Sequence, residues 1–568
     1  MNLTQLLEDQ ETQPLEEMLA ARLGALLGES SPHVLAALAL TAAAVRNGHV
    51  ALDTRALPFV WGGPPLKDSP LVGAPDQDLP LILDGDLLYL HRYHHHESLL
   101  AHGLRARAGL EIAVDHETLE ATLAKFFPEA EGAGIQDQRR AATVAATRAL
   151  CVVTGGPGTG KTTLVVRLLA TLVSLDAGPV RVRLLAPTGK AAHRLGESVN
   201  AQLDALGLTA MQREACPTQA ETLHRALGPI RGSRVRFRHD EATPIPADVV
   251  IVDEASMVDL AMMRRLVEAV PPTARLIFLG DPHQLASVDA GAVLAAICNP
   301  PSSSGQPSLL AGSLAHLHHS WRFDASGGIG ALAQAIQAGD VKAAMRALNH
   351  SDELTWVKEA PQECELLPAE TQRGFEDVIG HTEARSALQG LGQFKILCAI
   401  KKGGRGVDTL NAWCEQTLAR TSGLKPPRAR REGQPHNYEG RPILIQKNDY
   451  THGLYNGDQG LTRRSERGWI ACFESADGVK EIATARLPDH TTAFAMSIHK
   501  SQGSEYQSVA IVLPDAGHRM LTRELLYTAV TRARESILLY ASEEALAEAI
   551  ATPTVRVSGL TRRLWVDP

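Results

Sequence analysis

The chain has few cysteines, and none of them pair at the spacing of a metal site. Its seven cysteines (151, 216, 298, 364, 398, 414 and 472) are scattered, with no C-x-x-C pair among them. Zinc sites, iron–sulfur clusters and disulfide frameworks are built from clustered cysteines. The sequence therefore argues against all three and favours a reducing compartment.

Long hydrophobic runs and an excess of positive charge are also missing. The longest apolar run, residues 34–45, is alanine-rich and too short to cross a bilayer, and the N-terminus has no signal-peptide core. We therefore expect a cytoplasmic protein. Because the net charge is −8 and no long basic run occurs, any nucleic acid would have to be held by local basic surface.

The composition is that of an ordinary folded protein. Hydrophobic residues make up 44% of the chain and charged residues 21%, which excludes a disordered chain. At 568 residues the chain is too long for one hydrophobic core, so three or four domains are expected. No internal repeat is present.

What the sequence does contain is a phosphate-binding loop. Residues 155–162 read GGPGTGKT, between an apolar run at 151–154 and a helix-prone run at 163–169. Glycines let backbone N–H groups converge on phosphate oxygens at a helix N-terminus. Lys161 can reach the β- and γ-phosphates, and the Thr162 hydroxyl can hold Mg²⁺. The predicted ATP-binding run is Gly155, Gly156, Pro157, Gly158, Thr159, Gly160, Lys161, Thr162 and Thr163.

Two later motifs place acidic and amide groups after apolar strands. Residues 248–254 read DVVIVDE, so Asp253 would hold Mg²⁺ at the end of a strand and Glu254 would deprotonate the attacking water. A general base for water favours hydrolysis over kinase-type transfer. Residues 276–285 read LIFLGDPHQL, and Gln284 is placed to sense the γ-phosphate and couple its loss to movement.

In order along the chain, these motifs resemble those of superfamily 1 DNA helicases. Within that group (subfamily 1B) they resemble most closely the RecD family, the alpha subunits of RecBCD, or exonuclease V, complexes. Further matching segments are Gln138, APTGKAA at 186–192, TLHR at 222–225, HSWRF at 319–323, MSIHKSQGSE at 496–505 and ELLYTAVTRAR at 524–534. The departures are small: Trp321 stands where tyrosine is usual, and Pro282-His283 lies inside the third motif.

The resemblance implies a role for further residues. Gln138 would contact adenine, and Glu505 would also belong to the nucleotide site. Arg322 and Arg532 would bring positive charge to the γ-phosphate from the second motor domain, as arginine fingers do. The implied DNA-backbone contacts are Thr188, Lys190, Thr222, His224, Lys500 and Gln502. The same six residues could instead cap helices, above all Thr188 and Thr222.

Apolar runs alternate with amphipathic stretches, which predicts an α/β protein with parallel sheets. The resemblance implies that these sheets belong to two RecA-like motor domains. Strands are expected at 150–154, 182–186, 248–253 and 275–280, and again at 441–446, 458–462, 469–473, 493–498, 508–513 and 536–540. A small helical N-terminal domain should span 1–115. It would contain helices over 15–27 and 32–46 and a hairpin over 81–90, and His94, His95 and His96 would lie on a solvated or partner-facing surface.

The motor domains should span 116–330 and 331–568. The first would carry a small basic hairpin near 229–245, and the second an SH3-like β-barrel insertion at about 440–490. No nuclease motif is visible, and in the family cleavage is placed in the RecB partner. The resemblance thus implies an ATP-dependent 5′→3′ DNA helicase subunit. It would process double-strand ends for homologous recombination, in a heterotrimer with RecB-like and RecC-like subunits.

Three alternatives stay open at this point. A free-standing RecD-like or Dda-like helicase would have the same motor, but the N-terminal region of RecD length, which docks to RecC in the family, argues against it. A non-catalytic DNA clamp would not need Lys161, Glu254 and Arg532 intact. A P-loop metabolite kinase would leave the second motor domain unexplained.

Overall fold

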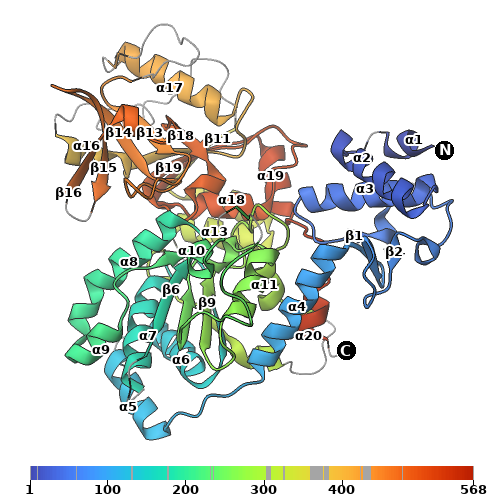
Figure 1. Cartoon of the computed structure of the whole chain (residues 1–568). Helices are drawn as coiled ribbons and strands as arrows, with labels where there is room; N and C mark the ends of the chain where they lie inside the picture. Colours follow the sequence, from blue (N-terminus) through green and yellow to red (C-terminus); the bar gives the residue numbers. More distant parts are fainter. Residues whose placement is uncertain are drawn as a thin grey trace.

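The computed structural model describes residues 2–566 apart from residues 9, 59, 129–131, 176, 177, 179, 231, 234, 235, 302–308, 324–326, 359–374, 376–382, 422, 423, 426–436, 476 and 477. Four sheets organise these residues, and two of the four are parallel throughout. The predicted α/β class is therefore confirmed (Figure 1). The division into domains at 115 and 330 stays a prediction.

The first parallel sheet carries the phosphate-binding loop. Its strand order is β10 (Leu314–Leu317), β5 (Leu150–Gly155), β9 (Arg275–Gly280), β8 (Val249–Val252), β6 (Val182–Ala186) and β7 (Glu221–Thr222). The four predicted strands appear within two residues of their expected ends. Neighbouring residues of β5 enter different hydrophobic clusters, Val152 on one face and Val153 on the other, so both faces of the sheet are covered.

Helices fill the two faces of this sheet. One face is covered by α5 (His116–Phe126), α6 (Ala133–Thr147), α7 (Lys161–Leu175) and α8 (Gly189–Leu203), with α9 (Ala210–Ala215) beside α7. The other face is covered by α10 (Leu223–Leu227), α11 (Leu260–Ala269) and α12 (Val293–Cys298). Since α7 begins at Lys161, directly after the loop, its N-terminus points to the place where phosphate would bind.

The second parallel sheet has the order β11 (Leu354–Val357), β20 (Ala533–Tyr540), β19 (Tyr506–Val512), β12 (Phe394–Cys398) and β18 (Ala495–Ser497). Its helices are α13 (Gly328–Ala338), α14 (Val341–His350), α16 (Ala384–Leu391), α17 (Val407–Thr421), α18 (Arg523–Val530) and α19 (Glu543–Ala551). Figure 1 shows α18 and α13 lying between the two parallel sheets. Segments that follow strands of both sheets line one cavity between them, which we call the cleft.

An antiparallel sheet is inserted before β18. Its order is β16 (Gly478–Ala483), β15 (Gly468–Ser475), β14 (Gln459–Ser465), β13 (Arg441–Ile445) and β17 (His490–Thr492). This short-stranded sheet covers the predicted insertion, and its closure into an SH3-like barrel stays a prediction. In the predicted basic hairpin, one antiparallel bridge joins Pro229 and Phe237, while residues 231, 234 and 235 lie outside the described residues.

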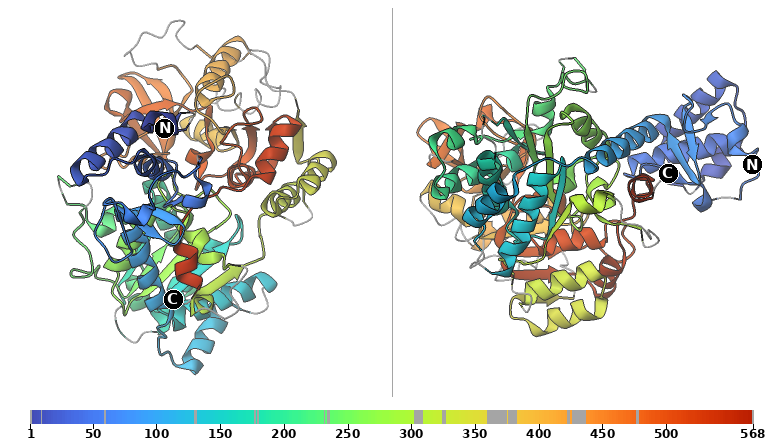
Figure 2. Two further views of the ribbon diagram at one scale, coloured as in Figure 1. Left: turned by 90° about the vertical axis from the view of Figure 1, so that its right-hand side faces the viewer. Right: turned by 90° about the horizontal axis from the view of Figure 1, so that it is seen from below.

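The N-terminal residues form a smaller unit that projects from the motor (Figure 2). It comprises α1 (Leu3–Leu7), α2 (Pro14–Leu27), α3 (Pro32–Arg46), β1 (Leu52–Asp53), β2 (Val72–Gly73), β3 (Leu81–Asp84), β4 (Leu87–Leu90) and α4 (His91–Ala108). The predicted hairpin is confirmed as β3 and β4, which turn at Gly85 with a positive φ of 61°. The two predicted helices are confirmed as α2 and α3.

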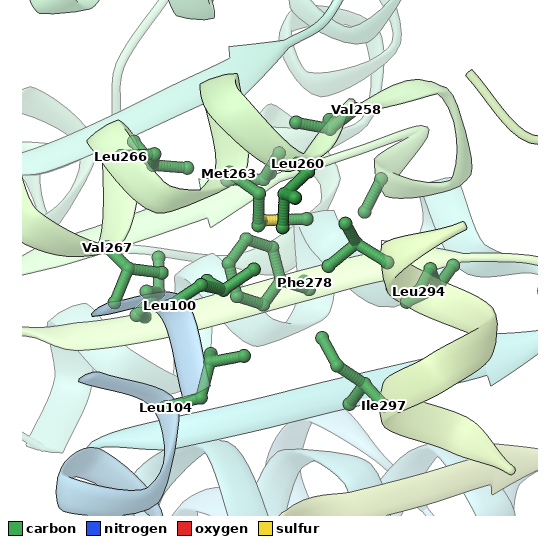
Figure 3. Close-up of a cluster of buried hydrophobic side chains, with 14 of the residues drawn as sticks. Leu100, Leu104, Val258, Leu260, Met263, Leu266, Val267, Phe278, Leu294 and Ile297 are labelled. Atoms are coloured by element: carbon green, nitrogen blue, oxygen red, sulfur yellow. The ribbon is translucent and has the colours of Figure 1, made fainter. Parts of the chain in front are cut away.

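Helix α4 is packed onto the first parallel sheet. Leu100 and Leu104 of α4 lie against Val267 of α11 and Phe278 of β9 in one buried cluster (Figure 3). The C-terminal helix α20 (Leu560–Trp565) adds Leu564 to the same cluster. Residues 560–565 therefore lie beside residues near position 100.

The expectation for the three adjacent histidines is wrong for two of them. His94 and His96 are buried, at 5% and 6% exposure, and His95 is the exposed one. Neighbouring helix residues point in different directions, and here two of those directions meet packed side chains. Burial lowers the pKa of His94 and of His96 to about 4, so both imidazoles are neutral at pH 7.

Candidate nucleotide site and motor cleft

The phosphate-binding loop has the backbone that its glycines predict. Gly158 and Gly160 have φ values of 78° and 82°, in the region that side chains disfavour. The Lys161 ammonium lies over the loop and donates to the carbonyl oxygens of Gly155 (2.7 Å) and Gly156 (2.9 Å). The loop and its lysine are thus arranged to surround an anion at the start of α7.

Asp253 and Glu254 lie at the end of β8, beside this loop. The Glu254 amide donates to Asp253 Oδ1 at 2.9 Å. Burial, followed by the negative charge of Glu254, raises the pKa of Asp253 to about 7. Glu254 has a φ of 54° and is the one non-glycine residue with positive φ among the described residues. Strained backbone of this kind marks functional positions, which supports the catalytic role expected for Glu254.

These residues fit a magnesium ion. Asp253 and Thr162 line the same cavity, of about 510 Å³, together with Lys161 and Glu254. Burial and the charge of Glu254 raise the pKa of Asp253 even though the Lys161 ammonium acts to lower it, and a divalent ion would add a further positive charge. Mg²⁺ is commonly held by one or two protein oxygens, with phosphate and water completing its shell. The chemistry of the two side chains therefore suits the predicted role.

Gln284 and Arg532 meet across the cleft. Arg532, just after α18, donates from Nη2 to Gln284 Oε1 at 3.2 Å, from Nη1 to Ser504 O at 3.2 Å and from Nε to Thr528 O at 3.0 Å. It is 4% exposed and lines the same cavity as Lys161. The structure thus brings a residue of the second sheet to the phosphate side of the first, as expected for an arginine finger.

Sequence reasoning missed the second layer around Gln284. Asp281 accepts hydrogen bonds from Gln284 Nε2 (3.1 Å) and from the Tyr527 hydroxyl (3.2 Å). The amide of Leu285 donates to Thr528 Oγ1 at 2.9 Å. Asp281 and Tyr527 lie within the motifs at 276–285 and 524–534, but no local pattern shows that two residues 246 positions apart share a hydrogen bond.

The expected origin of Arg322 is wrong. It was expected from the second motor domain, yet it follows β10, the edge strand of the first sheet. The neighbouring Trp321 amide donates to Gly158 O at 2.8 Å, and this bond holds the backbone before Arg322 against the phosphate-binding loop. Arg322 reaches the second sheet through an ion pair with Glu505. It therefore lines the nucleotide cavity from the connection between the two sheets.

Glu505 is held by two arginines. Arg534, which sequence reasoning also missed, pairs with Glu505 at 2.8 Å, while Arg322 contacts the other carboxylate oxygen. Burial alone would raise the pKa of Glu505, but the charges of Arg322 and Arg534 lower it. Glu505 is therefore an anion that orients Arg322, and its direct contact with nucleotide stays a prediction.

Gln138 lies next to the loop, as its predicted contact with adenine requires. It is 2% exposed, and its Nε2 is 2.8 Å from the position that a Cβ on Gly160 would take. Its Oε1 has no hydrogen-bond partner among the described residues. A larger cavity of about 810 Å³ adjoins on the other side of the loop, lined by Gly156, His319, Trp321 and Tyr527 among others. An unpaired buried acceptor near a cavity suits recognition of a base.

The predicted DNA contacts divide into two groups. Thr188 and Thr222 cap α8 and α10, because their hydroxyls accept from the amides of Ala191 (3.2 Å) and Arg225 (3.3 Å). This confirms the capping alternative for both threonines. His224 is exposed at the start of α10.

The other three predicted contacts join different parts of the chain. Lys190 donates to Gly457 O at 3.0 Å and to Ser504 Oγ at 2.7 Å, Lys500 to Gln446, and Gln502 to Leu285 O at 3.0 Å. Burial lowers the pKa of Lys190 to about 7. DNA binding by all six residues stays a prediction.

Comparisons with known proteins agree with the two-sheet arrangement. The family described as AAA domain matches residues 135–359, and the UvrD-like helicase C-terminal domain matches residues 492–540. The RecBCD enzyme subunit RecD of Mycolicibacterium smegmatis is 41% identical over 97% of this chain and 97% of its own length. The subunit of that name in Mycobacterium tuberculosis is 39% identical over 96% of this chain and 94% of its own.

A third relative has a different name. The ATP-dependent RecD2 DNA helicase of Deinococcus radiodurans is 33% identical over 77% of this chain, but the match covers 54% of that helicase. The two RecD subunits thus match this chain almost from end to end, including its N-terminal region. Among the described residues, none of the helices has the length and apolar content needed to cross a membrane.

Proposed function

Since the chain belongs to the family of RecBCD enzyme subunits named RecD, we propose that it is an ATP-dependent DNA helicase moving 5′→3′, in a complex with RecB-like and RecC-like subunits. That complex would process double-strand ends for recombination repair in the cytoplasm. The ATPase chemistry is supported by the geometry of the site, and the polarity and the repair role are supported by family membership.

The observation that carries the proposal is the bond between Arg532 and Gln284. It joins the second sheet to the first beside Lys161, Asp253 and Glu254. A nucleotide in this cavity would touch both sheets, so its γ-phosphate would decide how closely they approach. A metabolite kinase has no need for this second sheet, whereas a translocating motor does.

Each step of hydrolysis has a residue to perform it. Lys161 and the amides at the start of α7 would hold the phosphates, and Thr162 and Asp253 would hold Mg²⁺, which supplies charge neutralisation. Glu254 would accept a proton from the attacking water. Arg532 and Arg322 would stabilise the charge that develops on the transferred phosphoryl group.

Movement would follow from the same contacts. Loss of the γ-phosphate would weaken the hold of Gln284 on Arg532 and let the two sheets separate. Lys190 and His224 lie on the first sheet's helices, while Lys500 and Gln502 follow β18 of the second. Opening and closing would change the spacing between these two groups, which can grip a strand's phosphates in turn without reading sequence.

The N-terminal unit offers a surface for a partner subunit. Leu15, Met18, Leu19 and Leu26 lie on one face of α2 and are exposed, three of them by more than 60%. The opposite face packs on α3. Figure 2 shows this unit projecting away from the motor, and the exposure of these side chains means that none of the described residues covers the apolar face. We assign it to the RecC-like partner, where a stable contact should bury at least ~1,000 Å².

The rival reading is a free-standing helicase like RecD2. Both readings predict ATP hydrolysis stimulated by single-stranded DNA, and a kinase predicts none. Lys161→Gln should abolish that hydrolysis, because it removes the positive charge of the ammonium group at the β- and γ-phosphates. The variant should still fold. DNA-independent turnover in the parent, or near-normal turnover in Lys161→Gln, would contradict the proposal.

A further inference from the structure

The C-terminal segment fastens the second parallel sheet to the rest of the molecule. It leaves the second sheet's helices at α18, where the Arg523 amide donates to Thr552 O (2.8 Å) and the Thr554 amide donates to Glu524 Oε2 (2.7 Å). It ends in α20, where Trp565 Nε1 donates to Ala296 O of α12 at 3.1 Å. Residues 552–566 therefore run from the helix that precedes Arg532 to the helix that follows Gln284.

Midway, this segment crosses the N-terminal unit. Arg556 Nη1 donates to Asn47 O at 2.7 Å, and the Val557 amide donates to His49 Nδ1 at 3.0 Å. In return, the Val50 amide donates to Val557 O at 2.8 Å. Residues 556 and 557 thus contact the turn that follows α3, Arg556 through its side chain and Val557 through its backbone.

The same turn holds the far end of the loop that carries Gln284. The Gly291 amide donates to Gly48 O at 3.0 Å. The near end of this loop contacts the second sheet's segments through Leu285, whose amide donates to Thr528 and whose carbonyl accepts from Gln502. We call residues 47–51, 291, 556 and 557 the junction. The loop from 284 to 291 connects the junction to the γ-phosphate side of the cleft.

We propose that Arg556 is a positioning residue for ATP hydrolysis. Through the junction, Arg556 fixes the far end of the 284–291 loop, so that Gln284 meets Arg532. This inference rests on the proposed function, and it adds a path from the N-terminal unit to the motor. A partner bound to the N-terminal unit would act on turnover through the same turn.

Two features show that the junction is built around this arginine. An added Cβ on Gly48 would lie 0.9 Å from Arg556 Nη1, and Gly48 has a φ of 88°, so glycine is required there for space and for conformation. Arg556 has no carboxylate partner among the described residues, and its Nε is buried without a hydrogen bond there. A half-buried guanidinium without an ion pair lowers the stability of the folded protein. An arginine that served only as a surface residue would not be expected in this position.

The first test is steady-state ATP hydrolysis by the full chain with saturating single-stranded DNA. Arg556→Ala should lower kcat by about threefold to thirtyfold, the range for residues that carry coupling between sites, and leave KM for ATP nearly unchanged. Arg556→Lys keeps one charged donor for Asn47 O and should restore most of kcat. The matched control is Arg562→Ala, which removes an arginine of the same segment that pairs with Asp84 outside the junction.

A second variant checks that the junction acts as one unit. Gly48→Ala should show a loss like that of Arg556→Ala, and combining the two should add little, because both break the same contact. Parental kcat in Arg556→Ala, an equal loss in Arg562→Ala, or a loss that follows the melting temperature in every variant would overturn the proposal.

The last measurement separates this inference from the proposed function. Hydrogen–deuterium exchange with Mg²⁺ and a non-hydrolysable ATP analogue should slow at residues 285–292 and 47–51 together in the parent. In Arg556→Ala, only 285–292 should respond. If the parent hydrolyses ATP without DNA stimulation, the proposed function fails while this exchange pattern still decides the role of Arg556. No response at 47–51 in the parent would overturn it.

Discussion

Replacing Arg532 by alanine should lower turnover far more than it weakens ATP binding. Arg532 lines the cavity that contains Lys161 and Asp253, and its guanidinium is fixed by Thr528, Ser504 and Gln284 rather than by a carboxylate. Its charge is therefore held ready for the charge that develops in the transition state. Removing one such preorganised donor costs on the order of 10²–10³ in kcat, or about 3–4 kcal/mol.

The fold should survive, because the bonds lost are few. Alanine leaves four buried acceptors without Arg532, at about 1 kcal/mol each once water or neighbours compensate in part. The assay is steady-state ATP hydrolysis with single-stranded DNA, together with binding of a fluorescent ATP analogue and thermal unfolding. Arg532→Lys keeps the charge but cannot form the planar fork, so it should recover a small part of the rate.

Arg534→Ala is the matched control. Arg534 lies two residues away and pairs with Glu505, but its side chain is 52% exposed. Its loss should change kcat by a few-fold at most, as for exposed ion pairs. A rise in KM with normal kcat in Arg532→Ala, or equal losses in both variants, would refute the arginine-finger role.

Three further predictions concern Glu254, the partly buried Lys190 and the exposed apolar face of α2. Glu254→Gln should still bind ATP and Mg²⁺ but lose turnover by roughly 10²-fold or more; an equal loss of nucleotide binding, measured with the fluorescent analogue, would make Glu254 structural. Burial lowers the pKa of Lys190 in the folded protein to about 7, below its value in the unfolded chain. At a pH between these two pKa values, the unfolded state therefore binds more protons than the folded state. Relative to Lys190→Met, the parent should gain unfolding free energy as pH rises above about 7, by of order 1 kcal/mol per unit; a flat difference in denaturant titrations would contradict this. Met18→Glu on α2 should reduce co-purification with a RecC-like subunit, whereas Met211→Glu, an exposed methionine on α9, should not; undiminished yield with Met18→Glu would revive the free-standing helicase.

The sequence predicted what short segments decide for themselves. Strands β5, β6, β8 and β9 are continuous apolar runs because a parallel sheet covered on both faces allows little else. The phosphate-binding loop could be identified because its glycines are needed at φ values near 80°. Glu254 and Arg532 could be assigned because each has a fixed position in a sequence motif. Glu254 lies just after strand β8, and Arg532 lies just after helix α18.

What the sequence could not predict depends on distant segments. The pairing of Glu505 with Arg322 and Arg534, and of Lys190 with Gly457 and Ser504, joins residues that no local period relates. The burial of His94 and His96 follows from packing against β4 and α11 rather than from the helix itself.

The C-terminal segment is the clearest case of such long-range packing. Arg556 meets Asn47 across 509 positions, a contact that only the folded chain reveals. The origin of Arg322 could not be predicted for a related reason. Arg322 lies in the connection between the two parallel sheets, where no strand or helix periodicity shows which sheet a residue belongs to.

The measurement that tests the central claim most directly is the direction of movement on single-stranded DNA. The full chain should use ATP to displace streptavidin from an oligonucleotide biotinylated at its 3′ end. It should leave streptavidin in place on an oligonucleotide biotinylated at its 5′ end. Lys161→Gln should displace neither. Displacement from the 5′ end, or ATP-independent displacement by both proteins, would contradict the account of a 5′→3′ motor driven by this nucleotide site.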